Sequence, residues 1–356
     1  MGVPQARGLQ ESLPSDNPSL PLPLSPSQYP MEAKQFLQNC NKLRILVVGD
    51  LILDRYTWGR VNRISPEAPV PVVDVFEKGE RLGGAANVAH NLQAMGAQVA
   101  LCGVIGQDHA GHTLLKLAKE HQFDTSLILQ SDERRTTTKT RIFGNGQQVL
   151  RLDKEDRHYL PRIPAKRIIR RIDAQLASFD GIIFEDYDKG FLSPLVIRSV
   201  IQAAHKHQIF LAADPKFEQF LHYYAIDLFK PNRKELAQGL KLTLPPDDLP
   251  SIIQASQKLR KKMPHLYTLV TLSEQGVLFI DAEDTPKHLP AHKRSITDVS
   301  GAGDTVISVM TLALLAGVAP IQAAQFANLA GGLVCEEVGV VPIDAKRWLD
   351  ECERLG

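Results

Sequence analysis

The sequence predicts an α/β fold in which a mostly parallel sheet is covered on both faces by helices. Near-continuous apolar runs that end in glycine or a polar residue recur at 43–50, 98–106, 181–186, 209–214 and 267–272. Such runs are typical of strands buried on both faces. Helical segments alternate with them at about 85–95, 111–121, 164–178, 194–207 and 302–316. This alternation is the pattern of βαβ units, which build parallel sheets.

Composition limits the classes of protein and partner. The 356 residues are 44% hydrophobic, and 41 Lys and Arg against 40 Asp and Glu leave a net charge of +1. No field of one sign therefore attracts nucleic acid or an anionic membrane. The four cysteines show no CxxC spacing, which argues against a structural zinc site. No run of about 18 apolar residues, the length needed to span a membrane, occurs in the sequence. We expect a cytoplasmic protein that binds a small molecule, with no nucleic acid or membrane partner.

The first forty residues have a different composition from the rest. They include ESLPSDNPSLPLPLSPSQYP, a stretch dense in proline and serine. Proline lacks a backbone N–H, and such a stretch has no face to pack. We therefore expect residues 1–40 to form a largely disordered tail and residues 41–356 to form the folded domain.

Two segments interrupt the alternation of strands and helices. Residues 69–80 and 135–153 alternate polar and apolar residues with a period of two, and Gly144-Asn145-Gly146 marks a turn in the second. They predict a small antiparallel sheet, with lid segments at approximately 56–81 and 134–153. Such a sheet could cover a site or form a dimer surface, and an ordinary edge extension is the alternative.

Polar side chains stand at or just after the ends of the predicted strands. These residues are Asp50, Asp54, Glu185, Asp186, Asp214 and Asn232. Ligands of parallel sheets bind at the carboxyl ends of the strands. These positions are therefore candidates for a binding site.

The stretch DVSGAGD carries the strongest chemical signal. Gly301, Ala302 and Gly303 directly precede an apolar helical stretch, and Asp304 follows them. Unpaired N–H groups at a helix start bind anions, and small residues let an anion approach. A carboxylate beside them can accept a proton from an attacking hydroxyl, as phosphoryl transfer to an alcohol requires. A tight strand-to-helix turn capped by aspartate is the structural alternative.

Two weaker motifs accompany it. RLGGAANVAHNLQAMG places Gly83 and Gly84 before a helix with Asn87 near its start, and the side chain of Asn87 can bind hydroxyl groups. FKPNRKEL places Asn232 and Glu235 three residues apart after a strand, where they can face a phosphate or a metal-bound water. Each motif alone could be only a turn or a chance match. No P-loop, dinucleotide fingerprint or HExxH occurs, so those routes to nucleotide or metal binding lack support.

Together these stretches resemble the signatures of the ribokinase family of carbohydrate kinases, also called the PfkB family, across residues 43 to about 345. The resemblance implies a ribokinase-like three-layer α/β/α sandwich, ATP and Mg²⁺ as cofactors, and a homodimer formed through the β lid. It makes Asp304 the catalytic base and the amides of 301–303 the anion hole.

The resemblance also assigns binding residues. On the sugar side it implies Asp50, Asp54, Gly84, Asn87, Glu185 and Asp186, with Arg141, Arg151 and Lys189 as candidates for a sugar phosphate. On the nucleotide side it implies Asn232, Glu235, Thr271, Ser273, Gly276 and Asn328, with Glu235 near Mg²⁺ through water. Relatives usually have glycine at the position of Ser273, so we expect an altered backbone path there.

Three further stretches resemble the heptose 7-phosphate kinases of this family. They are GDLILDRYTWGRVNRISPEAPVPVV, RTTTKTRIFGNGQQVLRLDKED and EDYDKG. The implied activity is ATP-dependent phosphorylation of D-glycero-β-D-manno-heptose 7-phosphate at O1, in ADP-heptose synthesis for lipopolysaccharide, by a stand-alone kinase without a nucleotidyltransferase half. Another sugar or sugar-phosphate kinase of the family is the first alternative. A catalytically inactive sugar-binding module is the second.

Overall fold

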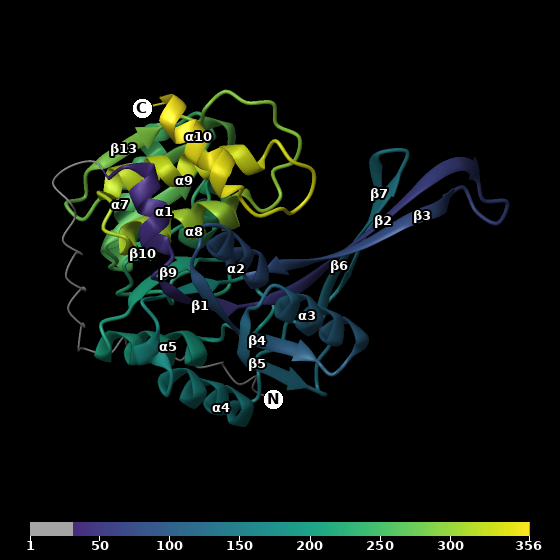
Figure 1. Ribbon diagram of the computed structural model, residues 1–356, viewed down its shortest axis with the longest axis horizontal. Helices are drawn as coiled ribbons and strands as arrows, with labels where there is room; N and C mark the ends of the chain where they lie inside the picture. The colour runs from purple at the N-terminus through teal and green to yellow at the C-terminus, as the bar shows by residue number, and fades with distance from the viewer. Residues whose placement is uncertain (1–30, 356) are drawn as a thin grey trace, which may run out of the picture.

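The structure is a computed structural model and describes residues 31–355 (Figure 1). Its main sheet has nine strands in the order β13-β12-β11-β10-β9-β8-β1-β4-β5. They are β1 (Arg44–Gly49), β4 (Gln98–Gly106), β5 (Asp124–Ser131), β8 (Gly181–Glu185), β9 (Phe210–Asp214), β10 (Leu228–Phe229), β11 (Tyr267–Thr271), β12 (Val277–Ile280) and β13 (Pro286–Leu289). Strand pairs from β5 to β11 are parallel, whereas β12 pairs antiparallel with both of its neighbours. The predicted mostly parallel sheet is confirmed.

Helices cover both faces of this sheet. One face carries α1 (Ala33–Cys40), α2 (Ala85–Ala94), α3 (His109–Glu120), α8 (Ala302–Leu315), α9 (Pro320–Val334) and α10 (Ala345–Leu355). The other carries α4 (Arg162–Asp173), α5 (Pro194–Lys206), α6 (Arg233–Leu240) and α7 (Leu249–Lys262). Alternate residues of β1 enter the two cores: Ile45 and Val47 face the first group of helices, and Leu46 and Val48 face the second.

The order of the strands reverses beside β1. From this strand the chain proceeds through β4 and β5 toward one edge, and later through β8 and β9 toward the other. Adjacent loops therefore leave the sheet in opposite directions at this point, which opens a crevice at the carboxyl ends of the strands. The topology places the expected binding site beside the ends of β1 and β8.

A second sheet projects from the main body as an arm (Figure 1). Its strands are β2 (Leu51–Ile64), β3 (Pro71–Gly84), β6 (Thr137–Gly144) and β7 (Gln147–Lys154), in the order β3-β2-β6-β7. The two hairpins are antiparallel, and a parallel β2–β6 pair joins them. Asn145 and Gly146 form the predicted turn with φ values of 52° and 83°, which is the conformation of a two-residue hairpin loop. We call these four strands the lid sheet.

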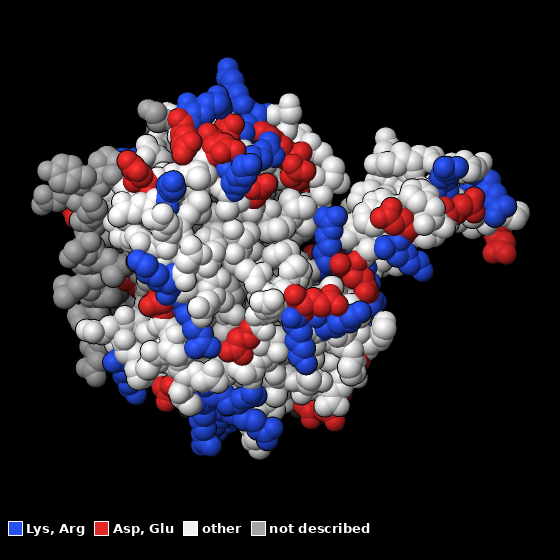
Figure 2. All heavy atoms as spheres, in the orientation of Figure 1, with Lys and Arg blue, Asp and Glu red and all other residues white. Residues whose placement is uncertain are grey.

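The face shown in Figure 2 carries both acidic and basic side chains, which gather at the top, the right and the lower edge of the body around a wide area without charge. This distribution agrees with the net charge of +1. An anionic ligand must therefore be held by local groups rather than by a broad basic surface. No helix among residues 31–355 has the length and apolar character needed to cross a membrane.

The predicted tail boundary is wrong for residues 33–40, which form α1. Phe36 and Cys40 lie four residues apart on one face of this helix and are fully buried. The Phe36 ring packs against Phe326 and Trp348 at centroid distances of 5.5 and 5.4 Å. The boundary was misplaced because the high proline and serine content of the preceding residues outweighed the short amphipathic pattern of this helix. The rest of the predicted tail, residues 1–30, lies outside the described residues.

We predict that Phe36→Ala destabilises the domain by about 3 kcal/mol, because the change leaves a cavity among the rings of Phe326 and Trp348. Urea unfolding followed by circular dichroism measures the effect. Lys34→Ala, at an exposed position of the same helix, is the matched control and should change stability by less than about 0.5 kcal/mol. Equal effects of the two substitutions would contradict the packing of α1.

Candidate active site

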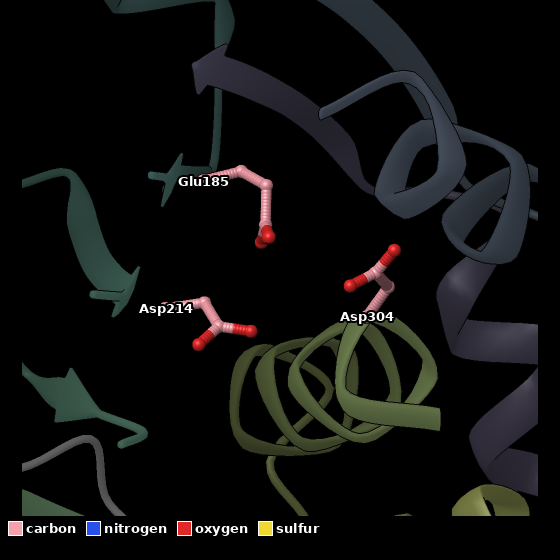
Figure 3. Close-up of side chains that lie close together, drawn as sticks. All are labelled: Glu185, Asp214 and Asp304. Carbon is pink, nitrogen blue, oxygen red and sulfur yellow. The ribbon is translucent and has the colours of Figure 1, made fainter. Parts of the chain in front are cut away.

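Three buried carboxylates converge at the crevice (Figure 3). Glu185 is the last residue of β8, Asp214 is the last residue of β9, and Asp304 stands in the first turn of α8. One carboxylate oxygen from each lies within 4.8 Å of the others. All three side chains are buried, with Asp304 only 6% exposed. Carboxylate oxygens at this spacing are suitable ligands for Mg²⁺.

Glu185 has the least satisfied side chain of the three. Both of its carboxylate oxygens are buried and find no hydrogen-bond partner among the described residues. Burial raises the pKa of Glu185 well above its ordinary value, and the carboxylates of Asp214 and Asp304 raise it further. A buried carboxylate without a partner is costly, so this position favours a bound cation or a hydroxyl-bearing ligand.

Asp304 is oriented by two hydrogen bonds. Asn87 Nδ2 donates to Asp304 Oδ2 at 2.6 Å, and the Tyr187 hydroxyl donates to Oδ1 at 3.1 Å. Burial raises the pKa of Asp304 to about 6, and the nearby charge of Asp214 contributes in the same direction. The group is therefore ionised at neutral pH but far more basic than an exposed aspartate, which suits a general base.

Polar contacts between α2 and α8 fix the relative positions of Asn87 and Asp304. Asn91, one turn after Asn87, accepts a hydrogen bond from the Thr305 hydroxyl at 2.9 Å. The Ser308 hydroxyl donates to the carbonyl of Val88 at 3.3 Å. Both contacts are buried, so they hold the two helices in a defined register.

The start of α8 has the geometry expected of an anion site. Gly301 precedes the helix with φ 84°, and a Cβ there would lie 2.9 Å from Asn87 Nδ2. Within residues 31–355, the N–H groups of Gly301, Gly303 and Asp304 have no hydrogen-bond acceptor, whereas Ala302 N–H points to Val299 O at 3.4 Å. The free amides and the helix dipole favour an anion at this turn.

Two lysines that the sequence analysis did not single out place positive charge beside the acidic residues of the site. Lys230 Nζ pairs with Asp214 at 2.8 Å and is 2% exposed, and Lys216 pairs with Glu235. Although burial opposes it, the charge of Asp214 raises the pKa of both lysines. A Cβ on Gly303 would lie 3.4 Å from Lys230 Nζ, so this ammonium borders the anion site. Their positions after strand ends, in DPK and FKPN, are the signal that could have identified them.

Residues predicted to bind the nucleotide form two adjoining groups. Asn232 caps α6, and its side chain and that of Glu235 exchange hydrogen bonds with each other's backbone N–H groups. Thr271, at the end of β11, forms a parallel bridge with Asn232. Both Glu235 oxygens are therefore engaged by protein donors, Lys216 and Asn232. The water-mediated metal contact of Glu235 stays a prediction.

The second group lies around residues 289–291. A Cβ on Gly276 would lie 2.2 Å from Leu289 O, and Asn328 Nδ2 donates to Pro290 O at 2.9 Å. Asn328 also lines a surface pocket together with Phe326. Ser273 has φ 56°, a left-handed conformation that glycine adopts more readily than serine, at a cost of about 1 kcal/mol. The altered backbone path expected there stays a prediction.

On the sugar side, the structure brings several predicted residues to the base of the lid sheet. Gly84 has φ 58°, and a Cβ there would lie 2.4 Å from Asp50 O, so only glycine fits this approach. Asp54 is buried in β2 and pairs with Arg141 of β6 at 2.5 Å. Asn87 lies beside Asp304, as described above.

Two predicted sugar ligands already have hydrogen-bond partners within the protein. Asp50 accepts hydrogen bonds from the backbone N–H groups of Tyr187, Lys189 and Phe191, so it holds this loop in place. Asp186 accepts from the Tyr223 hydroxyl at 2.8 Å, and burial, with the charge of Asp50, raises its pKa to about 8. Both carboxylates are therefore engaged by groups of the protein, and their roles as sugar ligands stay predictions.

Two basic candidates already have partners. Lys189 Nζ pairs with Glu155 at 2.8 Å and is largely buried. Arg151 pairs with Asp153 of its own strand and is half exposed. Lys189 follows Glu185 and Tyr187 in the loop beside the site, and Arg151 lies on the edge strand β7, in register with Arg141.

One arginine connects the lid sheet to the anion site. Arg81 of β3 donates to the carbonyl of Val340 at 3.1 Å, and a Cβ on Gly301 would lie 3.5 Å from the Val340 side chain. Asp298 accepts hydrogen bonds from Ser300 N–H and Gly339 N–H, both at 2.9 Å. The lid sheet, the 338–340 segment and the start of α8 are therefore in direct contact.

Comparison with known proteins identifies the family. The profile described as pfkB family carbohydrate kinase matches residues 42–346. The bifunctional protein HldE of Helicobacter acinonychis (strain Sheeba) is 41% identical over 296 residues, covering 83% of this chain and 63% of that protein. HldE of Pelobacter propionicus is 38% identical over 312 residues, covering 87% and 64%. The chain thus spans less than two thirds of these curated relatives.

Solved structures show the same fold at lower identity. Phosphofructokinase-2 from Escherichia coli, in complex with potassium, has a TM-score of 0.71 and 20% identity, covering 88% of this chain and 99% of that chain. Arabidopsis thaliana ribokinase, complexed with ribose and ATP, has a TM-score of 0.66 and 17% identity, covering 86% and 98%. The ribokinase-like fold that the sequence predicted is confirmed.

We predict that the carboxyl group of Asp304 titrates near pH 6 in the protein without Mg²⁺, because burial favours its protonated form. Carbon NMR of aspartate-labelled protein measures this titration, and the resonance is assigned by its loss in Asp304→Asn. A nearby cation favours the carboxylate, so added Mg²⁺ should lower the midpoint. A resonance that titrates near pH 4 without Mg²⁺ would contradict the environment described for this residue.

Proposed function

The chain belongs to the pfkB family of carbohydrate kinases, and we propose that its substrate is D-glycero-β-D-manno-heptose 7-phosphate, phosphorylated by ATP at O1. The product is the 1,7-bisphosphate, a precursor in ADP-heptose synthesis. The proposed catalytic mechanism rests on one observation: Asp304 is buried beside backbone N–H groups that have no acceptor at the start of α8. That arrangement supplies a base and an anion site at one point.

Asp304 acts as the general base in this proposal. Its carboxylate accepts the proton of the O1 hydroxyl as O1 forms a bond to the γ-phosphorus, while the bond from that phosphorus to the β–γ bridging oxygen breaks and ADP leaves. The N–H groups of Gly301 and Gly303 donate to the transferring phosphoryl group. Asn87 and Tyr187 orient the base and keep it ionised through their hydrogen bonds.

The carboxylates fit a divalent cation. Glu185 and Asp214 would hold Mg²⁺, because both are buried, adjoin Asp304 and offer oxygen ligands. Bound Mg²⁺ would neutralise charge on the nucleotide phosphates. Lys230 and Lys216 add positive charge on the same side of the site.

The choice of sugar rests on two sequence stretches, one beside the site and one at the tip of the lid sheet. RISPEAPVPVV forms the end of β2, the turn and the start of β3, and EDYDKG supplies Glu185, Tyr187 and Lys189. Both stretches resemble heptose 7-phosphate kinases, and the HldE proteins share about 40% identity with this chain. A kinase for another sugar phosphate is the alternative within the family.

We predict that Asp304→Asn lowers the turnover of phosphoryl transfer at least about 10³-fold, because it removes the base while keeping the side-chain shape. Purified protein is mixed with ATP, Mg²⁺ and heptose 7-phosphate, and the bisphosphate is quantified by mass spectrometry and phosphorus NMR. ATP binding, measured by calorimetry, should stay within about threefold of the parent.

Asp350→Asn, at an exposed position of α10, is the matched control and should turn over like the parent. Full turnover in Asp304→Asn would refute the assignment of the base. A higher kcat/KM for a hexose phosphate than for the heptose phosphate would replace the proposed substrate. Sugar binding without any transfer by the parent protein would favour an inactive sugar-binding module.

We also propose that two copies associate through the lid sheet. Several apolar side chains of this sheet are exposed to solvent, among them Phe76, which is 65% exposed, and Leu152, which is 51% exposed. Ile64, Val70, Val75, Val149 and Leu150 are exposed as well. Exposed apolar residues on both edge strands of a projecting sheet favour a protein interface.

We predict that Phe76→Asp with Leu152→Asp converts the dimer to a monomer, because it places charges in the apolar contact. Light scattering at micromolar concentration measures the mass. Ile163→Asp is the matched control, since Ile163 is 74% exposed but lies on α4, outside the lid sheet. A monomeric parent protein would refute the proposal.

A further inference from the structure

Three cationic side chains gather at the base of the lid sheet. Lys139 and Arg141 stand on β6, and Lys189 follows β8. Arg141 is paired with Asp54 and Lys189 is paired with Glu155, at 2.5 and 2.8 Å. Two of the three positive charges are therefore compensated within the protein.

Lys139 is the exception. Across residues 31–355, its ammonium group has neither an ion pair nor a hydrogen-bond acceptor, although the side chain is half-buried. Its Nζ lies 4.8 Å from the centre of the Tyr187 ring. The hydroxyl of the same ring donates to Asp304. A single tyrosine side chain thus separates this free cation from the base.

The surroundings of Lys139 favour an anion. Burial lowers the pKa of its ammonium group, and the charges of Lys189 and Arg141 act in the same direction against that of Asp54. A half-buried cation beside two others is unfavourable until a counter-charge arrives. Phosphate oxygens supply that charge and accept charge-assisted hydrogen bonds from an ammonium group.

We propose that Lys139 binds the phosphate that the sugar substrate already carries, and so makes the enzyme selective for phosphorylated sugars. This inference rests on the proposed kinase function. The transferring phosphoryl group belongs at the start of α8, where Gly303 borders Lys230. Lys139 belongs to the lid sheet, beside Asp54 in register. In this arrangement the sugar would lie between the two residues. Its reacting hydroxyl group would meet Asp304, and the phosphate at its other end would meet Lys139.

Lys139→Gln tests the assignment by the difference between two substrates. We expect KM for heptose 7-phosphate to rise about 10- to 100-fold, because a charge-assisted hydrogen bond is lost. KM for ATP, and kcat/KM for the same heptose without its phosphate, should change less than about threefold. Lys139→Arg keeps the charge and should recover most of the loss. Lys78→Gln, at an exposed position of β3, is the matched control and should behave as the parent.

The outcomes separate this inference from the proposed function. If the parent prefers another phosphorylated sugar, the same comparison is made with that sugar, and a selective rise in its KM supports Lys139 while refuting the heptose. If the parent phosphorylates heptose 7-phosphate but Lys139→Gln leaves its KM unchanged, the role of Lys139 is refuted alone. Equal losses on both substrates, or on ATP, also refute it. A parent that prefers unphosphorylated sugars overturns both.

Discussion

The close approach of three carboxylates in a buried crevice is the constraint on which the site depends. Glu185, Asp214 and Asp304 repel one another, and burial withholds the water that would screen them. Lys230 offsets part of this repulsion by pairing with Asp214, and Asn87 and Tyr187 donate to Asp304. The charges of Lys230 and Lys216 offset part of the cost of burying Glu185, but its two oxygens have no hydrogen-bond partner in the described protein, so this position favours a ligand.

The alternation of side chains along the strands explains which acidic residues enter the crevice. Glu185 lies two residues after Ile183, which faces the core beneath α8, and Asp214 lies two residues after Ala212 on the same side. Asp186 has the opposite parity and meets Tyr223 in the other core. Asp50 likewise follows Val48 and binds the backbone of the 187–191 loop. A difference of one residue along the strand therefore decides whether a carboxylate enters the crevice or binds another part of the protein.

The sequence was sufficient for the parts of the molecule that depend on local pattern. The buried strands, the helices between them, the Asn145-Gly146 turn and the helix start at Asp304 all follow from residues close in the chain. It was insufficient where the structure depends on burial or on a contact with a residue distant in the chain. The ion pair of Lys230 with Asp214 joins residues from different strand ends, and α1 is stable because Phe36 meets rings from α9 and α10.

The contact between the lid sheet and the anion site has a mechanical consequence. Asp298 binds the N–H groups of Ser300 and Gly339, so the segment before α8 and the 338–340 segment move together. Arg81 attaches the second of these segments to β3. A displacement of the lid sheet therefore acts directly on the backbone that precedes Gly301. β2 and β3 also leave and rejoin the body beside β1. The strands that we propose cover the sugar therefore adjoin the amides at the start of α8, and neither half of the crevice is positioned independently of the other.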